Sequence, residues 1–69
     1  MIHIKFDWSG YIVTYDDGNI VCTDMEENSM GTYTMGATMI VGSTLIPSDI
    51  RREIKEELDR TLASIAAFE

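Results

Sequence analysis

Cysteine, histidine, proline and tryptophan occur only once each in this chain of 69 residues. With Cys22 alone an intramolecular disulfide is excluded, and a single thiol is typical of a protein from a reducing compartment. Apolar and acidic neighbours disfavour the Cys22 thiolate, so this thiol is a poor nucleophile. His3 has the chemistry of a general base, but the sequence implies no nucleophile beside it. We therefore predict a protein with neither a disulfide nor enzymatic activity.

Positive charge is also scarce. The chain holds 5 Lys and Arg residues against 12 Asp and Glu residues, a net charge of −7. This balance repels nucleic-acid phosphates and anionic membrane surfaces, and it favours basic protein partners. No apolar run approaches the length that spans a bilayer, and the N-terminus shows no basic and then apolar leader. These absences predict a soluble cytoplasmic protein that binds neither nucleic acid nor membranes directly.

The length of the chain limits its core. Residues 1–69 suffice for a single domain, and a domain of this size buries only about 60% of the surface that its unfolded form exposes. Association into a homodimer, or binding to a partner, would supply stability that so small a core lacks.

The segment from Ser48 to Ala67 has the apolar period of a helix. Its large aliphatic residues recur at steps of four, four, four and three, which places them in one stripe along a helix roughly 30 Å long. Pro47 ends any strand before it. We predict an amphipathic helix over residues 48–67 whose stripe covers one face of a sheet. The stripe consists of Ile50, Ile54, Leu58, Leu62 and Ile65.

Three alternating segments, residues 2–8, 11–16 and 19–24, predict antiparallel strands. Ser9-Gly10 and Asp17-Gly18 between them are two-residue turns, and Asp-Gly suits a type I′ turn because that turn needs positive φ. Such turns fix the pairing of the strands, so the apolar side chains share one face. The predicted opposite pairs are Trp8–Tyr11, Phe6–Val13, Ile4–Tyr15, Tyr15–Ile20, Val13–Cys22 and, on the other face, His3–Asp16.

The next part of the sheet has two interpretations. Residues 25–30 (MEENSM) break the alternation and predict a loop, and residues 31–41 alternate again. We predict one long fourth strand bent at Gly36, with the alternative of a hairpin that turns at Gly36-Ala37 and adds a fifth strand. A single long strand places Ile40 on the face away from the helix. Residues 1–42 thus form an antiparallel sheet of four or five strands, of undetermined strand order, in an α+β fold.

No spacing in the chain predicts a metal or cofactor site. The acids around Asp17-Gly18 lack the alternating oxygen ligands and the distal glutamate of a calcium loop. Gly31, Gly36 and Gly42 follow no phosphate-loop spacing. We expect no metal, no cofactor and no catalytic residues.

Two surface features suggest a site for a protein partner. Residues 1–47 hold six acids against one base, a net of −5, and an acidic surface complements a basic groove. Apolar side chains predicted to lie outside the core form the second feature, and methionines suit adaptable contact surfaces. Ile40 belongs to this apolar group under the single-strand interpretation. The candidate partner-binding residues are Asp16, Asp17, Asp24, Glu26, Glu27, Ile12, Val21, Met25 and Met30.

In its size, its acidity and its combination of one antiparallel sheet with a single helix, the whole chain resembles the small phage-encoded proteins that block bacterial defence systems, anti-CRISPR proteins among them. The resemblance implies an interaction protein that binds and inhibits or modulates a larger, basic, nucleic-acid-handling protein. The alternative is a structural protein that assembles with itself, as a homodimer or a larger oligomer, through the outer face of the sheet or a free strand edge.

Overall fold

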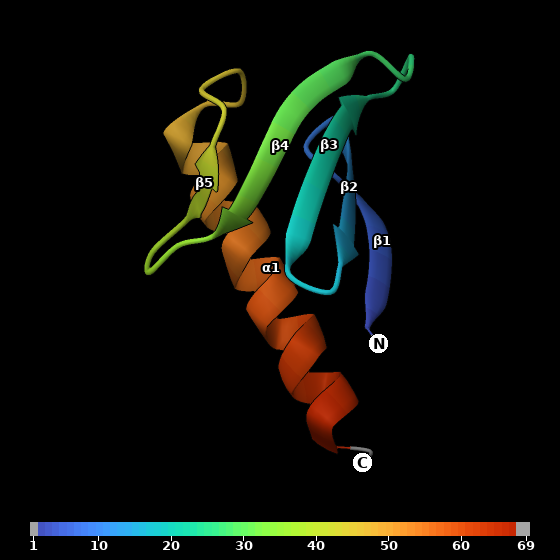
Figure 1. Cartoon of the computed structure of the whole chain (residues 1–69), viewed down its shortest axis with the longest axis vertical. Coiled ribbons are helices and arrows are strands. Elements are labelled where there is room, and N and C mark those ends of the chain that lie inside the picture. Colours follow the sequence, from blue (N-terminus) through green and yellow to red (C-terminus); the bar gives the residue numbers. More distant parts are fainter. Residues whose placement is uncertain (1, 68–69) are drawn as a thin grey trace.

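The computed structural model describes residues 2–67, which form a five-stranded antiparallel sheet followed by one helix (Figure 1). The architecture is therefore the predicted α+β class with a C-terminal helix. The elements are β1 (His3–Trp8), β2 (Tyr11–Asp16), β3 (Asn19–Asp24), β4 (Ser29–Met35), β5 (Ile40–Gly42) and α1 (Ser48–Ala67).

The strands follow one another across the sheet in chain order, so β1 and β5 are its two edges. Both predicted two-residue turns are present: Ser9 and Asp17 have φ of 52° and 51°, and the following Gly10 and Gly18 have φ of 86° and 100°. Positive φ at both turn residues matches the right-handed twist of the flanking strands. All six predicted cross-strand pairs are confirmed, including Val13 opposite Cys22.

Helix α1 covers the inner face of the sheet (Figure 1). Of its apolar stripe only Ile54 and Leu58 are fully buried, while the other three members are partly buried against the core. Figure 1 shows why: α1 lies diagonally behind the sheet, and its last turns extend beyond the ends of the strands. The buried core is Ile4, Val13, Ile20, Cys22, Tyr33, Ile40, Ile46, Ile54 and Leu58.

The prediction of one long fourth strand was wrong. The alternative, a hairpin that adds a fifth strand, is correct in its number of strands. β4 ends at Met35, and residues 36–39 connect it to β5, with the Gly36 N–H donating to the Met39 carbonyl at 3.0 Å. Gly36 does not have the positive φ of a type II′ turn. A Cβ on Gly36 would lie 2.5 Å from that carbonyl oxygen, so its lack of a side chain serves a close approach of the backbone.

The hairpin also reverses the predicted position of Ile40. Reversal of the chain pairs Ile40 with Met35, which puts it on the inner face, where it is fully buried. The acidic loop is also shorter than predicted, because β4 begins at Ser29. Met30 therefore lies in a strand and packs against the core.

A side-chain hydrogen bond joins the edge strand β1 to helix α1. The Trp8 indole Nε1–H donates to Glu53 Oε1 at 3.0 Å. Trp8 is the only tryptophan, and it also packs against the core cluster. Its fluorescence therefore reports on the docking of α1 against β1.

Candidate protein-binding surface

The sheet face opposite α1, here called the outer face, carries β-branched and small polar side chains. The alternation of the strands and their register place every second residue there. In β3, Val21 lies opposite Thr14 on one side and Thr32 on the other, and Thr34 lies opposite Val41. The outer-face residues of β2–β5 that carry no charge are Ile12, Thr14, Asn19, Val21, Thr23, Ser29, Thr32, Thr34 and Val41.

Two apolar residues of this face are well exposed, Val21 at 43% and Val41 at 44%. They border a shallow hollow of about 480 Å³ over β3, β4 and β5, whose wall also includes Asn19, Thr32 and Thr34. Ile12, which was predicted for this face together with Val21 and Ile40, is half-buried. The structure thus places Ile12 and Val21 on one face, as diagonal neighbours across β2 and β3.

Val41 is the residue that the sequence prediction missed. A single strand over residues 31–41 places Val41 with Tyr33 on the inner face, whereas the hairpin turns it outward beside Thr34. The signal was the competing turn at Gly36, since a reversal through an even number of loop residues, here the four residues 36–39, changes the face of the residues that follow.

The loop between β3 and β4 is organised by Asp24. Its Oδ1 accepts the backbone N–H groups of Glu26 at 2.8 Å and of Asn28 at 2.9 Å, and its Oδ2 accepts the Asn28 side-chain amide at 3.0 Å. The Asp24 N–H donates to the Asn28 carbonyl at 2.9 Å, and the Glu27 N–H donates to the Asp24 carbonyl at 3.1 Å. Asp24 therefore orders the loop, and the exposed residues of the loop are Met25, Glu26, Glu27 and Asn28.

These hydrogen bonds change the titration of Asp24. The Asn28 backbone N–H lowers the pKa of the Asp24 carboxyl below its ordinary value of 3.8, and the Asn28 side-chain amide and the Glu26 N–H lower this pKa further. Because folding favours the carboxylate, its stabilisation is fully present above the unfolded pKa near 3.8 and is lost as the pH falls through the lower folded pKa.

We expect the wild type to exceed Asp24→Ala in free energy of unfolding by a constant amount above about pH 5, and by a shrinking amount below about pH 4. Urea unfolding at a series of pH values, followed by Trp8 fluorescence, measures this difference. Asn28→Ala removes the side-chain amide donor but keeps the Asp24 carboxylate. The pH dependence of its free energy of unfolding should therefore lie between those of the wild type and Asp24→Ala. A difference that stays the same from neutral pH to the acid limit would contradict the role of Asp24.

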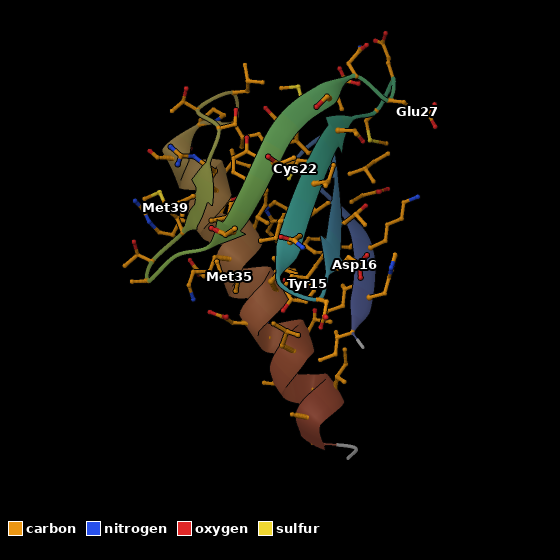
Figure 2. All side chains as sticks on the ribbon, in the orientation of Figure 1. Tyr15, Asp16, Cys22, Glu27, Met35 and Met39 are labelled. Carbon is orange, nitrogen blue, oxygen red and sulfur yellow. The ribbon has the colours of Figure 1, made fainter. Side chains whose placement is uncertain are left out.

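The acidic residues predicted to bind a partner lie at the two ends of β3 and do not form one cluster. Asp16 and Asp17 lie at the turn before β3, and Glu26 and Glu27 lie in the loop after it. Figure 2 shows Asp16 and Glu27 at opposite ends of the sheet. A strand of six residues separates these ends by roughly 17 Å. Met25, at the second end, is 59% exposed.

His3 and Cys22 are the two residues that the sequence analysis considered for catalysis. His3 lies opposite Asp16, as predicted, at the exposed edge of the sheet. Cys22 is fully buried, and burial raises the pKa of its thiol to about 11, which removes it as a nucleophile at neutral pH. Within residues 2–67 no three His, Cys, Asp or Glu side chains come close enough to share a metal ion.

Within the same residues, no helix has both the length and the apolar character needed to cross a membrane. No protein-family model matches the chain, and neither the curated proteins nor the solved structures include a significant match to it.

Proposed function

We propose that this protein is a small acidic interaction protein that binds a larger protein with a basic, nucleic-acid-handling surface and inhibits or modulates it. The observation that carries the proposal is the position of the acids at both ends of β3, where they border an exposed and uncharged sheet face. Interfaces between proteins commonly combine a centre depleted of charge with a polar rim.

The charge around this surface is nearly all of one sign. Lys5 is the single Lys or Arg residue before Arg51, and it lies in β1, whereas the acidic ends flank β3. On α1, by contrast, Lys55 and Arg60 pair with Asp59 and Glu57. The sheet surface is therefore the part of the described chain with the least internal compensation of its acids, and complementary charge would speed association with a basic partner.

The experiment is an affinity capture with the tagged protein from a bacterial lysate, washed at low and high salt. We expect a nucleic-acid-binding protein to be retained at low salt and released as the salt rises, because ion pairs at an exposed rim are screened. Glu26→Gln/Glu27→Gln should reduce its recovery.

A matched control is available on the helix. Glu56→Gln/Glu57→Gln removes the same charge from two adjacent glutamates far from β3 in sequence. The Glu57–Arg60 pair that it breaks has a 72% exposed arginine, so its loss matters little for stability. Equal recovery with both double variants, or recovery that does not respond to salt, would overturn the proposal.

A second candidate function, self-assembly through the outer face, is favoured by the exposure of Val21 and Val41. Salt distinguishes the two functions. Copies that each carry a net charge of −7 repel one another, so self-association strengthens as salt screens the repulsion, whereas binding to a basic partner weakens. Light scattering of the purified protein across salt concentrations, with Val21→Lys as the disrupting variant, tests self-assembly.

A further inference from the structure

We infer that the outer face of β2–β5 is a docking surface for an amphipathic helix of the partner, one with an apolar stripe at its centre and basic residues at both ends. The inference rests on the proposed function, and it specifies the part of the partner that binds. The observation behind the inference is that acids lie at both ends of β3, whereas the outer face of β2–β5 between those ends carries no charge.

The centre of the outer face is free of charge. All charged residues of the strands and turns lie either on β1 or at the two ends of β3. Between those ends the exposed side chains are Asn19, valines and threonines, and the hollow beside Val21 and Val41 is lined by uncharged residues. A partner placing a charge here would lose hydration without gaining a counter-ion, so its contact stripe is expected to be apolar.

A strand of the partner could not form backbone hydrogen bonds with the central strands of this sheet. β3 is hydrogen-bonded to β2 and to β4, so its N–H and C=O groups are already paired. Strand addition requires a free edge: β5 is only three residues long, and β1 presents His3, Lys5 and Asp7 on its outer side. The partner therefore meets the face with side chains, and a helix laid across a sheet face is the arrangement that α1 already adopts on the inner side.

The positions of the acids specify the length of the helix. The two ends of β3 lie roughly 17 Å apart, a distance that a helix covers in about 11 residues at 1.5 Å per residue. Asp16 and Asp17 at one end and Glu26 and Glu27 at the other would each receive Lys or Arg side chains. The partner helix is thus expected to carry its basic residues about three turns apart, with Leu- or Val-type residues between them.

The test uses a synthetic helical peptide of about 15 residues, with leucines at i, i+4 and i+7 and a pair of lysines near each end. A second peptide of the same composition has its leucines moved so that they form no stripe. Each is titrated into the isotopically labelled full chain at low salt, and backbone and methyl NMR shifts are followed. We expect the striped peptide to shift Val21, Thr32 and Val41, and to bind at least about tenfold more tightly than the rearranged peptide.

Two variants at one exposed position add a second readout. Val21→Lys should weaken the striped peptide by at least about tenfold through like-charge repulsion and lost apolar contact, and Val21→Thr, which keeps the β-branched shape, should stay within about threefold. Unchanged far-UV circular dichroism shows that each variant is folded.

Absence of binding, equal binding of the two peptides, or shifts confined to α1 or to the Glu26–Glu27 loop would overturn the inference. None of these results bears on capture of a basic partner through the acidic ends. The proposed function fails only in the lysate experiment, so the two failures are distinguishable.

Discussion

Leu58→Ala is expected to lower the free energy of unfolding by about 2 to 5 kcal/mol. Leu58 is fully buried against the inner face of the sheet, and truncation leaves a cavity that the surrounding strands fill only in part. A domain of this length has a total stability of roughly 3 to 10 kcal/mol, so one side chain carries a large share of it. Urea unfolding, followed by Trp8 fluorescence and far-UV circular dichroism, measures the loss.

Leu62, one turn further along α1, is the matched control. It belongs to the same stripe and is the same residue type, but it is only partly buried. Leu62→Ala should therefore destabilise the protein clearly less than Leu58→Ala, because less apolar surface returns to water. Similar losses at the two positions would show that the C-terminal turns of α1 are as tightly docked as its middle, contrary to this structure.

Gly31→Ala is expected to be strongly destabilising for two reasons, backbone strain and a steric clash. Gly31 has a φ of +101°, and a Cβ there would lie 2.3 Å from Ser43 Cβ and 2.6 Å from Ser43 Oγ. Gly18, with a φ of +100°, has open space around the same position. Gly18→Ala should therefore show the backbone strain alone, about 1 to 3 kcal/mol, and Gly31→Ala should add the clash of β4 with the segment after β5.

Ser43→Gly separates the two contributions. It removes the atoms that a Cβ at residue 31 would meet, although it also removes the acceptor that Ser43 Oγ offers to the Leu45 N–H. In a double-mutant cycle, the loss caused by Gly31→Ala should be smaller in the Ser43→Gly background, with a coupling of about 0.5 to 3 kcal/mol. Independent effects of the two substitutions, measured by urea unfolding, would contradict the close approach of Gly31 and Ser43.

The parts of the fold that the sequence predicted correctly are those where one local rule determines the outcome. A two-residue turn leaves the flanking strands one way to pair, so Ser9-Gly10 and Asp17-Gly18 predicted the register of three strands. The helix followed from its period alone.

The β4–β5 hairpin could not be predicted in the same way, because a strand and its reversal share the same alternation of residues. Gly36 was a correct sign of irregularity, yet the glycine accommodates the Met39 carbonyl and lacks the positive φ of the expected turn. What decides between the two interpretations is the burial of Ile40 under α1, and that contact lies far from residue 36 in the sequence.

The candidate surface was predicted only in part, since the sequence predicted neither Val41 on it nor the arrangement of its acids. The acidic segments and Val21 were recognised, whereas the separation of the acids by the length of β3 required the strand bounds. Asp24 was grouped with the surface acids, but its carboxylate is engaged within the loop. An aspartate whose side chain accepts the N–H two residues later is a known turn former, so this signal was present in the sequence.

The strict chain order of the strands affects the order in which the parts of the protein fold. Each strand pairs with the one synthesised just before it, so the hairpins can close within about 1 to 10 µs of their emergence. The inner face is covered by α1, the last element in the chain, together with Ile46 before it. Until α1 docks, the sheet presents Ile4, Val13 and Ile20 to water, so helix docking is the step that buries this apolar surface.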